Sequence, residues 1–188
     1  MYNDRALLIT YPDYPVNTDT FYGYTEMVGH AGVLLIKQDG LTKYYEFGRY
    51  DPAKNGKVRN QTIPNAEIGN DGKPTASSLK KILSKLSTVS GKATRIRAAY
   101  FINLNFEEML AYAIQKQPEY SILNFNCGHY AQAVILKGNP RIDKPFIINP
   151  TPNNIVDEYI EEGNAEVLFS PTTGEITIGK GDESDAKE

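Results

Sequence analysis

Two segments rich in apolar and aromatic residues lie close together in the first third of the chain, separated by a short polar turn. Residues 29–37 are small and mostly apolar, residues 41–50 are rich in Tyr and Phe, and the turn at 38–40 reads Gln-Asp-Gly. A three-residue loop with glycine at its left-handed position predicts a β-hairpin in which Lys37 pairs with Leu41.

The register of this hairpin brings two polar residues to the same face of the predicted sheet. Counting back from the loop places Gly32 opposite Glu46 and His30 opposite Gly48. Side chains alternate along a strand and pairing preserves the face, so all four residues point to one side. His30 and Glu46 are then diagonal neighbours, a separation that long side chains span, and the two glycines leave room for the contact.

The rest of the chain alternates between helical and strand-like patterns. Apolar residues at helical spacing and residues that commonly start or stop helices predict three helices and a short fourth one. The helices are expected between Thr75 or Ser77 and Gly91, between Asn105 and Pro118, between Asn126 and Gly138, and over 153–162. Alternating residues predict a half-buried strand over 96–102, and 146–148 is a further candidate strand.

The chain has no internal repeat, and residues 1–170 are interpreted as a single domain. Residues 51–74 are rich in Pro, Gly and Asn, which predicts a long surface loop with little regular structure. From residue 171 the chain is rich in Thr, Gly and charged residues. This composition predicts a polar, flexible C-terminal tail over 171–188.

The composition narrows the class of protein. The chain has 188 residues, 20 Lys plus Arg against 23 Asp plus Glu, and 40% hydrophobic residues. These values fit one folded, mildly acidic domain and argue against a broad basic surface for nucleic acid. No run approaches the roughly 18 consecutive apolar residues of a membrane span. Residues 1–16 lack the basic start and long apolar core of a secretory signal, so we expect synthesis in the cytoplasm without a signal peptide.

The single cysteine, Cys127, stands at the predicted start of a helix. It excludes an intramolecular disulfide, and two histidines are too few to make a Cys and His zinc site easy to assemble. Asn126 is a good N-cap, which makes Cys127 the first helical residue. The unpaired N–H groups and the positive dipole end of a helix start favour a thiolate and also the oxyanion of a tetrahedral intermediate. The alternative is a buried structural thiol, because free cysteine is among the most buried residue types.

A cysteine nucleophile needs a base, for which there are two histidines. His129 lies two positions beyond Cys127, about 200° around the helix axis, so its side chain points away and a structural role is expected. His30, at the entrance to a strand and followed by small residues, is the better partner by elimination. Glu46 is the candidate for the third group, which orients the imidazole and stabilises its charged form. The alternative for Glu46 is a solvent-facing carboxylate on a hairpin.

These residues stand in segments that resemble a known family. Residues 29–36 (GHAGVLLI), 44–50 (YYEFGRY) and 126–131 (NCGHYA) are similar to the circularly permuted NlpC-type branch of papain-fold cysteine hydrolases, which includes the lecithin:retinol acyltransferase-like enzymes. Gly128 and Tyr130 depart from the acyltransferase motif, and Glu at the third position resembles the bacterial permuted hydrolases instead. The resemblance implies an α+β, papain-like fold in which an antiparallel sheet packs against the helix that carries a catalytic cysteine.

Residues 47–52 (FGRYDP) and 56–60 (GKVRN) also resemble type VI secretion effectors that attack the cell wall of rival bacteria. This resemblance implies a cysteine amidase or endopeptidase with a Cys127, His30 and Glu46 triad that cleaves an amide bond in peptidoglycan stem peptides. Such an enzyme needs neither a metal nor an organic cofactor. The resemblance further implies that the protein is secreted, that it acts in the periplasm of the target cell, and that an immunity protein is its partner.

Several residues near the predicted site are candidate substrate contacts. Arg49, Arg59 or Lys57 would receive the carboxylates of a stem peptide, and Asn126 stands beside the nucleophile. The alternative for the basic residues is ordinary surface charge.

Three other functions stay open at this point. The Cys motif favours a lipid acyltransferase or phospholipase, although the chain lacks the second His and the hydrophobic C-terminal anchor common in that family. A protein deamidase or isopeptidase of the same fold is a third enzymatic hypothesis. The non-enzymatic alternative is an inactive papain-fold binding module, in which the tyrosines form a recognition surface.

Overall fold

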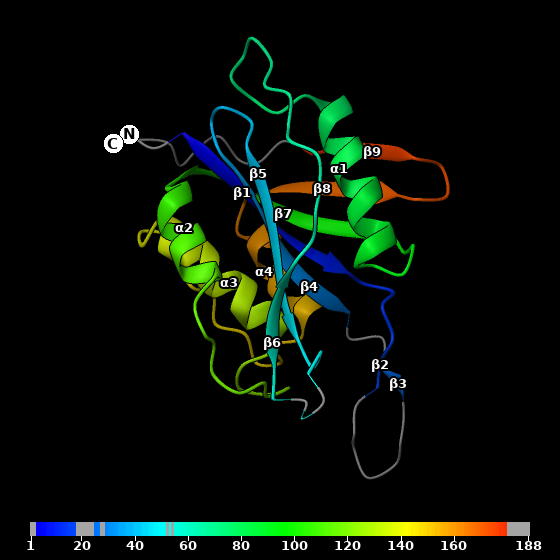
Figure 1. The fold of residues 1–188 in the computed structure, drawn as a ribbon, viewed down its shortest axis with the longest axis vertical. Coiled ribbons are helices and arrows are strands. Elements are labelled where there is room, and N and C mark those ends of the chain that lie inside the picture. The colour runs from blue at the N-terminus through cyan, green and yellow to red at the C-terminus, as the bar shows by residue number, and fades with distance from the viewer. Residues whose placement is uncertain (1–2, 18–24, 27–28, 52, 54, 180–188) are drawn as a thin grey trace.

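The computed structural model describes residues 3–17, 25–26, 29–51, 53 and 55–179, and within them it contains a seven-stranded sheet and four helices (Figure 1). The strands of the large sheet are β1 (Asp4–Tyr11), β4 (His30–Ile36), β5 (Thr42–Gly48), β6 (Lys57–Asn60), β7 (Ile96–Leu104), β8 (Ala165–Ser170) and β9 (Glu175–Ile178). The helices are α1 (Ala76–Val89), α2 (Phe106–Ala113), α3 (Cys127–Gly138) and α4 (Pro152–Glu161). A separate two-stranded sheet pairs β2 (Val16–Asn17) with β3 (Thr25–Glu26). The expected mixture of helices with an antiparallel sheet is confirmed.

The central strand of the sheet is β1, although its sequence does not show the alternation of a half-buried strand. The strand order is β6-β5-β4-β1-β7-β8-β9, and all neighbours are antiparallel. Ala6 and Leu8 pack on one face, whereas Leu7 and Ile9 pack on the other. Because both faces are covered, the strand reads as a continuous apolar run, which periodicity alone does not assign to a strand. The sequence analysis therefore missed it.

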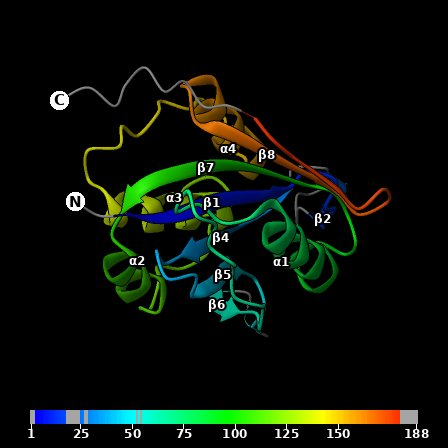
Figure 2. The ribbon, with the colours of Figure 1, turned by 90° about the horizontal axis from the view of Figure 1, so that it is seen from above.

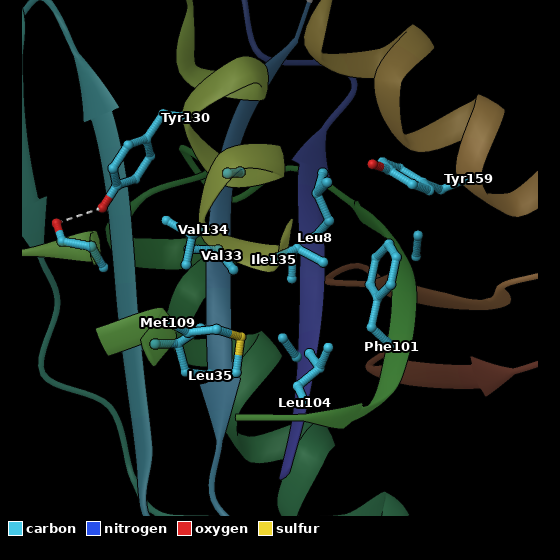
Figure 3. Packing of buried hydrophobic residues seen from close by; sticks show 14 of the residues in the cluster. Leu8, Val33, Leu35, Phe101, Leu104, Met109, Tyr130, Val134, Ile135 and Tyr159 are labelled. Carbon is cyan, nitrogen blue, oxygen red and sulfur yellow. Dashed lines mark hydrogen bonds between the residues drawn. The ribbon is translucent and has the colours of Figure 1, made fainter. Parts of the chain in front are cut away.

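Helices cover both faces of the sheet. Helices α2, α3 and α4 pack on one face and α1 packs on the other (Figures 1 and 2). On the α3 face, Val33 of β4 and Phe101 of β7 form a buried cluster with Ile135 of α3 (Figure 3). In the same cluster the hydroxyl of Tyr130 donates a hydrogen bond to the carbonyl oxygen of Ala113, at 2.9 Å. This bond ties α3 to the end of α2.

The predicted β-hairpin has the predicted register. The N–H of Lys37 donates to the carbonyl oxygen of Leu41 at 2.8 Å, and Gly32 pairs with Glu46. Gly40 has a φ of 94°, the left-handed conformation that the three-residue loop requires.

The predicted helix starts are confirmed at three side chains. Thr75 caps α1 by accepting from the N–H of Ser78, and Asn105 and Asn126 cap α2 and α3 in the same way. The fourth predicted helix is α4.

Two predictions about irregular segments are wrong. Residues 57–60, expected within a loop, form β6, which pairs with β5 and extends the sheet. Residues 146–148, expected as a strand, are not in one, and the side chains of Phe146 and Ile148 are 90% and 91% exposed. Both errors have one cause: strand formation depends on pairing with another strand, which local composition does not reveal.

The predicted tail is also wrong in its first part. The chain turns after Ser170 and returns as β9, which pairs with β8 and places Ile176 opposite Phe169. Residues 180–188, the rest of the predicted tail, lie outside the described residues.

Two features of the described residues bear on function. None of their helices is both long and apolar enough to cross a membrane. Across the same residues, no cluster of three or more His, Cys, Asp or Glu side chains is arranged to hold a metal ion.

We expect Tyr130→Phe to lower the free energy of unfolding by about 1–2 kcal/mol, because it removes the hydrogen bond to the buried carbonyl of Ala113. Urea unfolding followed by circular dichroism measures the change. Tyr45→Phe, at a half-buried tyrosine of β5, is the matched control and is expected to change stability by less than about 0.5 kcal/mol. Equal losses in the two variants would contradict the role of the hydrogen bond.

Candidate active site

The thiol of Cys127 lies at the first position of α3, as predicted. Asn126 is the N-cap, and its side-chain oxygen accepts from the N–H groups of Gly128, at 2.9 Å, and His129, at 3.1 Å. The thiol is largely buried, with 3% of the residue exposed. The helix start therefore directs its positive dipole end toward a site largely shielded from water.

The side chain of Asn126 is fully used within the protein. Its amide nitrogen donates to the carbonyl oxygens of Ile122, at 2.9 Å, and Pro150, at 2.8 Å. These bonds join the segments on either side of α3 to the helix start. These bonds give Asn126 the role of holding Cys127 in place, and a contact between Asn126 and substrate stays a prediction.

His129 lies where the helix geometry predicted. Its Nδ1 accepts from the N–H of Asn126 at 3.3 Å, which completes a capping box, and its ring stacks on Phe125. Burial lowers the pKa of His129, and the charge of Lys144 lowers it further. The role of His129 in the described structure is to stabilise the helix start.

His30 and Glu46 form the predicted pair. His30 is the first residue of β4, and its Nε2 lies 2.9 Å from Oε2 of Glu46 on β5. Both residues are buried, and Glu46 is 0% exposed. They point to the face of the sheet that α1 covers, whereas Cys127 begins a helix on the other face. The two parts therefore meet at the end of the sheet, where β4 begins.

Two tyrosines complete the hydrogen bonds of this pair. The hydroxyl of Tyr44 donates to Oε2 of Glu46 at 3.1 Å, and the hydroxyl of Tyr50 lies 2.9 Å from Nε2 of His30. Behind them, the hydroxyl of Tyr11 lies 3.0 Å from that of Tyr44.

The two glycines opposite the pair make room for these tyrosines. A Cβ on Gly32 would collide with the hydroxyl of Tyr44, and one on Gly48 would lie 2.8 Å from the ring of Tyr50. The sequence analysis expected the space to serve the contact between His30 and Glu46 alone. In the structure, the same space admits the tyrosine rings that surround that contact.

The second oxygen of Glu46 binds residues from the far side of the hairpin. Oε1 accepts from Nε of Arg59 on β6 and, at 3.4 Å, from the amide of Gln61. The guanidinium of Arg59 also lies over the ring of Tyr50, 3.7 Å from its centroid. Arg59 is therefore engaged by Glu46 through Nε, and its contact with a substrate carboxylate stays a prediction.

The electrostatics of the pair favour its charged form. Burial acts to lower the pKa of His30, but the charge of Cys127 and a hydrogen bond to it, together with the bond to Glu46, raise that pKa to about 10. Burial acts to raise the pKa of Glu46, but the hydrogen bond to His30 and the charges of His30 and Arg59 lower it to about 2. The imidazolium and the carboxylate thus stabilise each other beside the thiol.

Tyr120 is a further neighbour of the thiol. Burial raises the pKa of Tyr120 above its usual range, and the charge of Cys127 and a side-chain hydrogen bond to it raise it further, whereas a bond to the Cys127 backbone lowers it. Arg49 lies over the Tyr120 ring, 5.3 Å from its centroid, and is thereby brought close to the site as expected. Lys57 is exposed at the start of β6.

The sequence analysis missed the residues that surround the pair: Tyr11, Tyr44, Tyr50, Gln61 and Tyr120. A signal existed for Tyr44, because it lies two positions before Glu46 and so points to the same face. No comparable signal existed for Tyr120, whose place depends on the path of the chain between α2 and α3.

Comparison with known proteins gives first a class, the bacterial type VI secretion effectors. Within it, the chain belongs to the family described as type VI secretion system effector TseH-like, whose model matches residues 6–143. The fold is similar to the crystal structure of the type VI secretion system effector TseH, with a TM-score of 0.77 and 25% sequence identity, covering 95% of this chain and 98% of that one. No curated protein matches the chain.

The pKa values of His30 and Glu46 determine how their contributions to stability depend on pH. His30 has a folded pKa of about 10 against an ordinary 6.5, so its contribution is fully present below pH 6.5 and is lost as pH rises through 10. Glu46 has a folded pKa of about 2 against 4.5, so its contribution is present above pH 4.5 and is lost as pH falls through 2.

In Glu46→Gln the carboxylate no longer stabilises the imidazolium, so we expect the pKa of His30 to fall below about 10 and the alkaline loss of stability to begin at lower pH. NMR titration of the imidazole protons measures the pKa, with His129 as an internal reference. Urea unfolding at a series of pH values measures the stability. An unchanged pKa of His30 in Glu46→Gln would show that Glu46 does not stabilise the charged imidazole.

We expect Gly48→Ala to displace Tyr50 from His30, because the new methyl group would lie 2.8 Å from the tyrosine ring. The expected results are slower alkylation of Cys127 by iodoacetamide and a loss of about 1–3 kcal/mol in stability. Gly179→Ala is the matched control, since a Cβ there makes only ordinary contacts of 3.5 Å or more. Equal alkylation rates in Gly48→Ala and Gly179→Ala would show that Tyr50 does not position His30.

Proposed function

We propose that this effector is a cysteine amidase or endopeptidase that cleaves an amide bond in peptidoglycan stem peptides. The observation that carries the proposal is the hydrogen bond between His30 and the buried Glu46, located beside the only cysteine of the chain. A nucleophile, a base and a group that orients the base are the parts that thiol acyl transfer requires. The resemblance to papain-fold hydrolases also supports a cysteine amidase or endopeptidase.

The first step of the proposed reaction is attack by the thiolate. Nε2 of His30 is engaged by Glu46 and Tyr50, so we assign Nδ1 to accept the proton of Cys127. The sulfur then forms a bond to the carbonyl carbon of the scissile amide, and the electron pair of the C=O bond moves onto its oxygen.

The oxyanion that forms needs hydrogen-bond donors. The N–H groups of Gly128 and His129 are used by Asn126, so we assign the Cys127 N–H, whose partner before substrate binds is Tyr120, to turn to the oxyanion. The hydroxyl of Tyr120, adjacent to both the thiol and the backbone of Cys127, is the second donor. The sequence analysis assigned all the helix-start N–H groups to the oxyanion. Because Asn126 binds two of them, we restrict that role to the Cys127 N–H.

The remaining steps return the enzyme to its starting state. The imidazolium of His30 gives its proton to the leaving amine as the C–N bond breaks, and a thioester remains. His30 then deprotonates a water molecule, which attacks the carbonyl carbon of the thioester. The C–S bond of the thioester breaks, and the product is released as a carboxylate. Glu46 stays ionised and stabilises the imidazolium in each half-reaction. This sequence of steps needs no metal or organic cofactor.

Membership of a type VI effector family supports a substrate in a rival bacterium. Peptidoglycan in the target periplasm is the substrate that the resemblance to cell-wall-attacking effectors favours. On this proposal, the producing cell needs an immunity protein that blocks the site, because the enzyme would otherwise attack its own wall or that of its kin.

The test is mass spectrometry of peptidoglycan fragments after incubation with the purified protein. We expect the wild type to release new fragments that identify the cleaved bond, Cys127→Ala to release none, and His30→Ala to be slower by about 10²–10⁴-fold. His129→Ala is the matched histidine control and is expected to lower stability while cleavage continues. Intact peptidoglycan with a folded wild-type protein, or full activity in Cys127→Ala, would overturn the proposal.

A further inference from the structure

A cavity lies between the hairpin side of the sheet and the segment that joins α2 to α3. Its volume is about 460 Å³, within the range of about 300–1,000 Å³ that is usual for small-molecule sites. Phe47 of β5 and the residues that begin β6 form one wall, and residues 114–119 form the other. No role for this cavity follows from the triad alone.

Tyr120 connects the wall of the cavity to the candidate nucleophile. Tyr120 directly follows the second wall, and its backbone N–H donates to the carbonyl oxygen of Asn55 in the first wall, at 2.5 Å. Its ring packs on Phe47, with 5.5 Å between centroids, and its hydroxyl reaches Cys127. A chain bound in the cavity thus passes within the length of one tyrosine side chain of the thiol.

The first wall is held in a fixed shape. The carboxylate of Asp51 accepts from the N–H groups of Asn55, at 3.1 Å, and Gly56, at 3.0 Å. Gly56 has a φ of 103°, and a Cβ there would collide with the ring of Phe47 and with the Cβ of Tyr120. The wall is therefore built before a ligand binds, which lowers the cost of binding.

The charge on the two walls indicates what the cavity binds. Lys57 on the first wall and Lys116 on the second are both exposed, and Arg49 lies over the ring of Tyr120. Glu119 is the acidic residue among the described lining residues, so positive charge dominates. Paired ammonium groups on facing walls favour a ligand that carries carboxylates.

We propose that this cavity is the subsite for the carboxylate-bearing part of the stem peptide, with Lys57 and Lys116 as its recognition groups. The inference rests on the proposed function and adds the feature of the substrate that the enzyme selects. The apolar side chains of Phe47 and Ile114 in the same lining provide contacts for short apolar side chains of the peptide.

The test compares two stem peptides, one with free side carboxylates and one with those carboxylates amidated. We expect wild-type kcat/KM to favour the free peptide by about fivefold at low ionic strength, and the preference to shrink as salt is added. In Lys57→Gln/Lys116→Gln the preference falls close to one through a higher KM for the free peptide. Lys80→Gln/Lys85→Gln, at two exposed lysines of α1 on the other side of the sheet, removes the same charge and keeps the preference.

Failure of this inference is separable from failure of the proposed function. If the wild type cleaves both peptides equally, or if the α1 variant loses the preference as the cavity variant does, the subsite is wrong while the amidase stands. If the wild type cleaves neither peptide, the proposed function fails. Calorimetric binding of the two peptides to Cys127→Ala then decides the subsite: tighter binding of the free peptide supports it, and equal binding overturns it.

Discussion

The buried carboxylate of Glu46 is the group on which the site depends. A charge without access to water is costly unless it is paired and hydrogen-bonded, and Glu46 is bonded by His30, Tyr44, Arg59 and Gln61. Each of these donors constrains a different part of the chain. The hairpin register sets the distance between Glu46 and His30. Pairing of β6 with β5 brings Arg59 within hydrogen-bond distance of Glu46. Residue 32 must lack a side chain, because the Tyr44 hydroxyl occupies the space where one would lie.

The candidate nucleophile, Cys127, and its candidate base, His30, come from opposite faces of the sheet and meet only at its end. Helix α3 packs on the face that contains Ala6 and Leu8, whereas the network of His30 and Glu46 lies on the opposite face. The two meet because Cys127 and His30 are each the first residue of their element. Rigid packing of α3 on the sheet therefore fixes the distance between sulfur and imidazole more strictly than a pair of loops would.

Local sequence rules predicted the parts of the site that depend on neighbouring residues. Glycine in the three-residue turn fixed the hairpin register and thus the pairing of His30 with Glu46. The capping side chain of Asn126 fixed the start of α3. Strand pairing was beyond those rules: β6 was expected within a loop, so Arg59 was predicted to be a substrate contact or a surface charge and not a partner of Glu46. The rings of Tyr50 and Tyr120 reach the site only through chain paths that no local pattern records.

The position of β6 at the edge of the sheet has a consequence for the durability of the site. Outer strands exchange their hydrogen bonds with water more readily than central ones, and they open at lower free energy than the whole domain. Separation of β6 alone would remove Arg59 and expose the Glu46 carboxylate to solvent while β1 and its neighbours stay folded. The ion pairs around the imidazole of His30 are thus less protected than the fold itself. On the proposed function, mild heating inactivates the enzyme before it unfolds the domain.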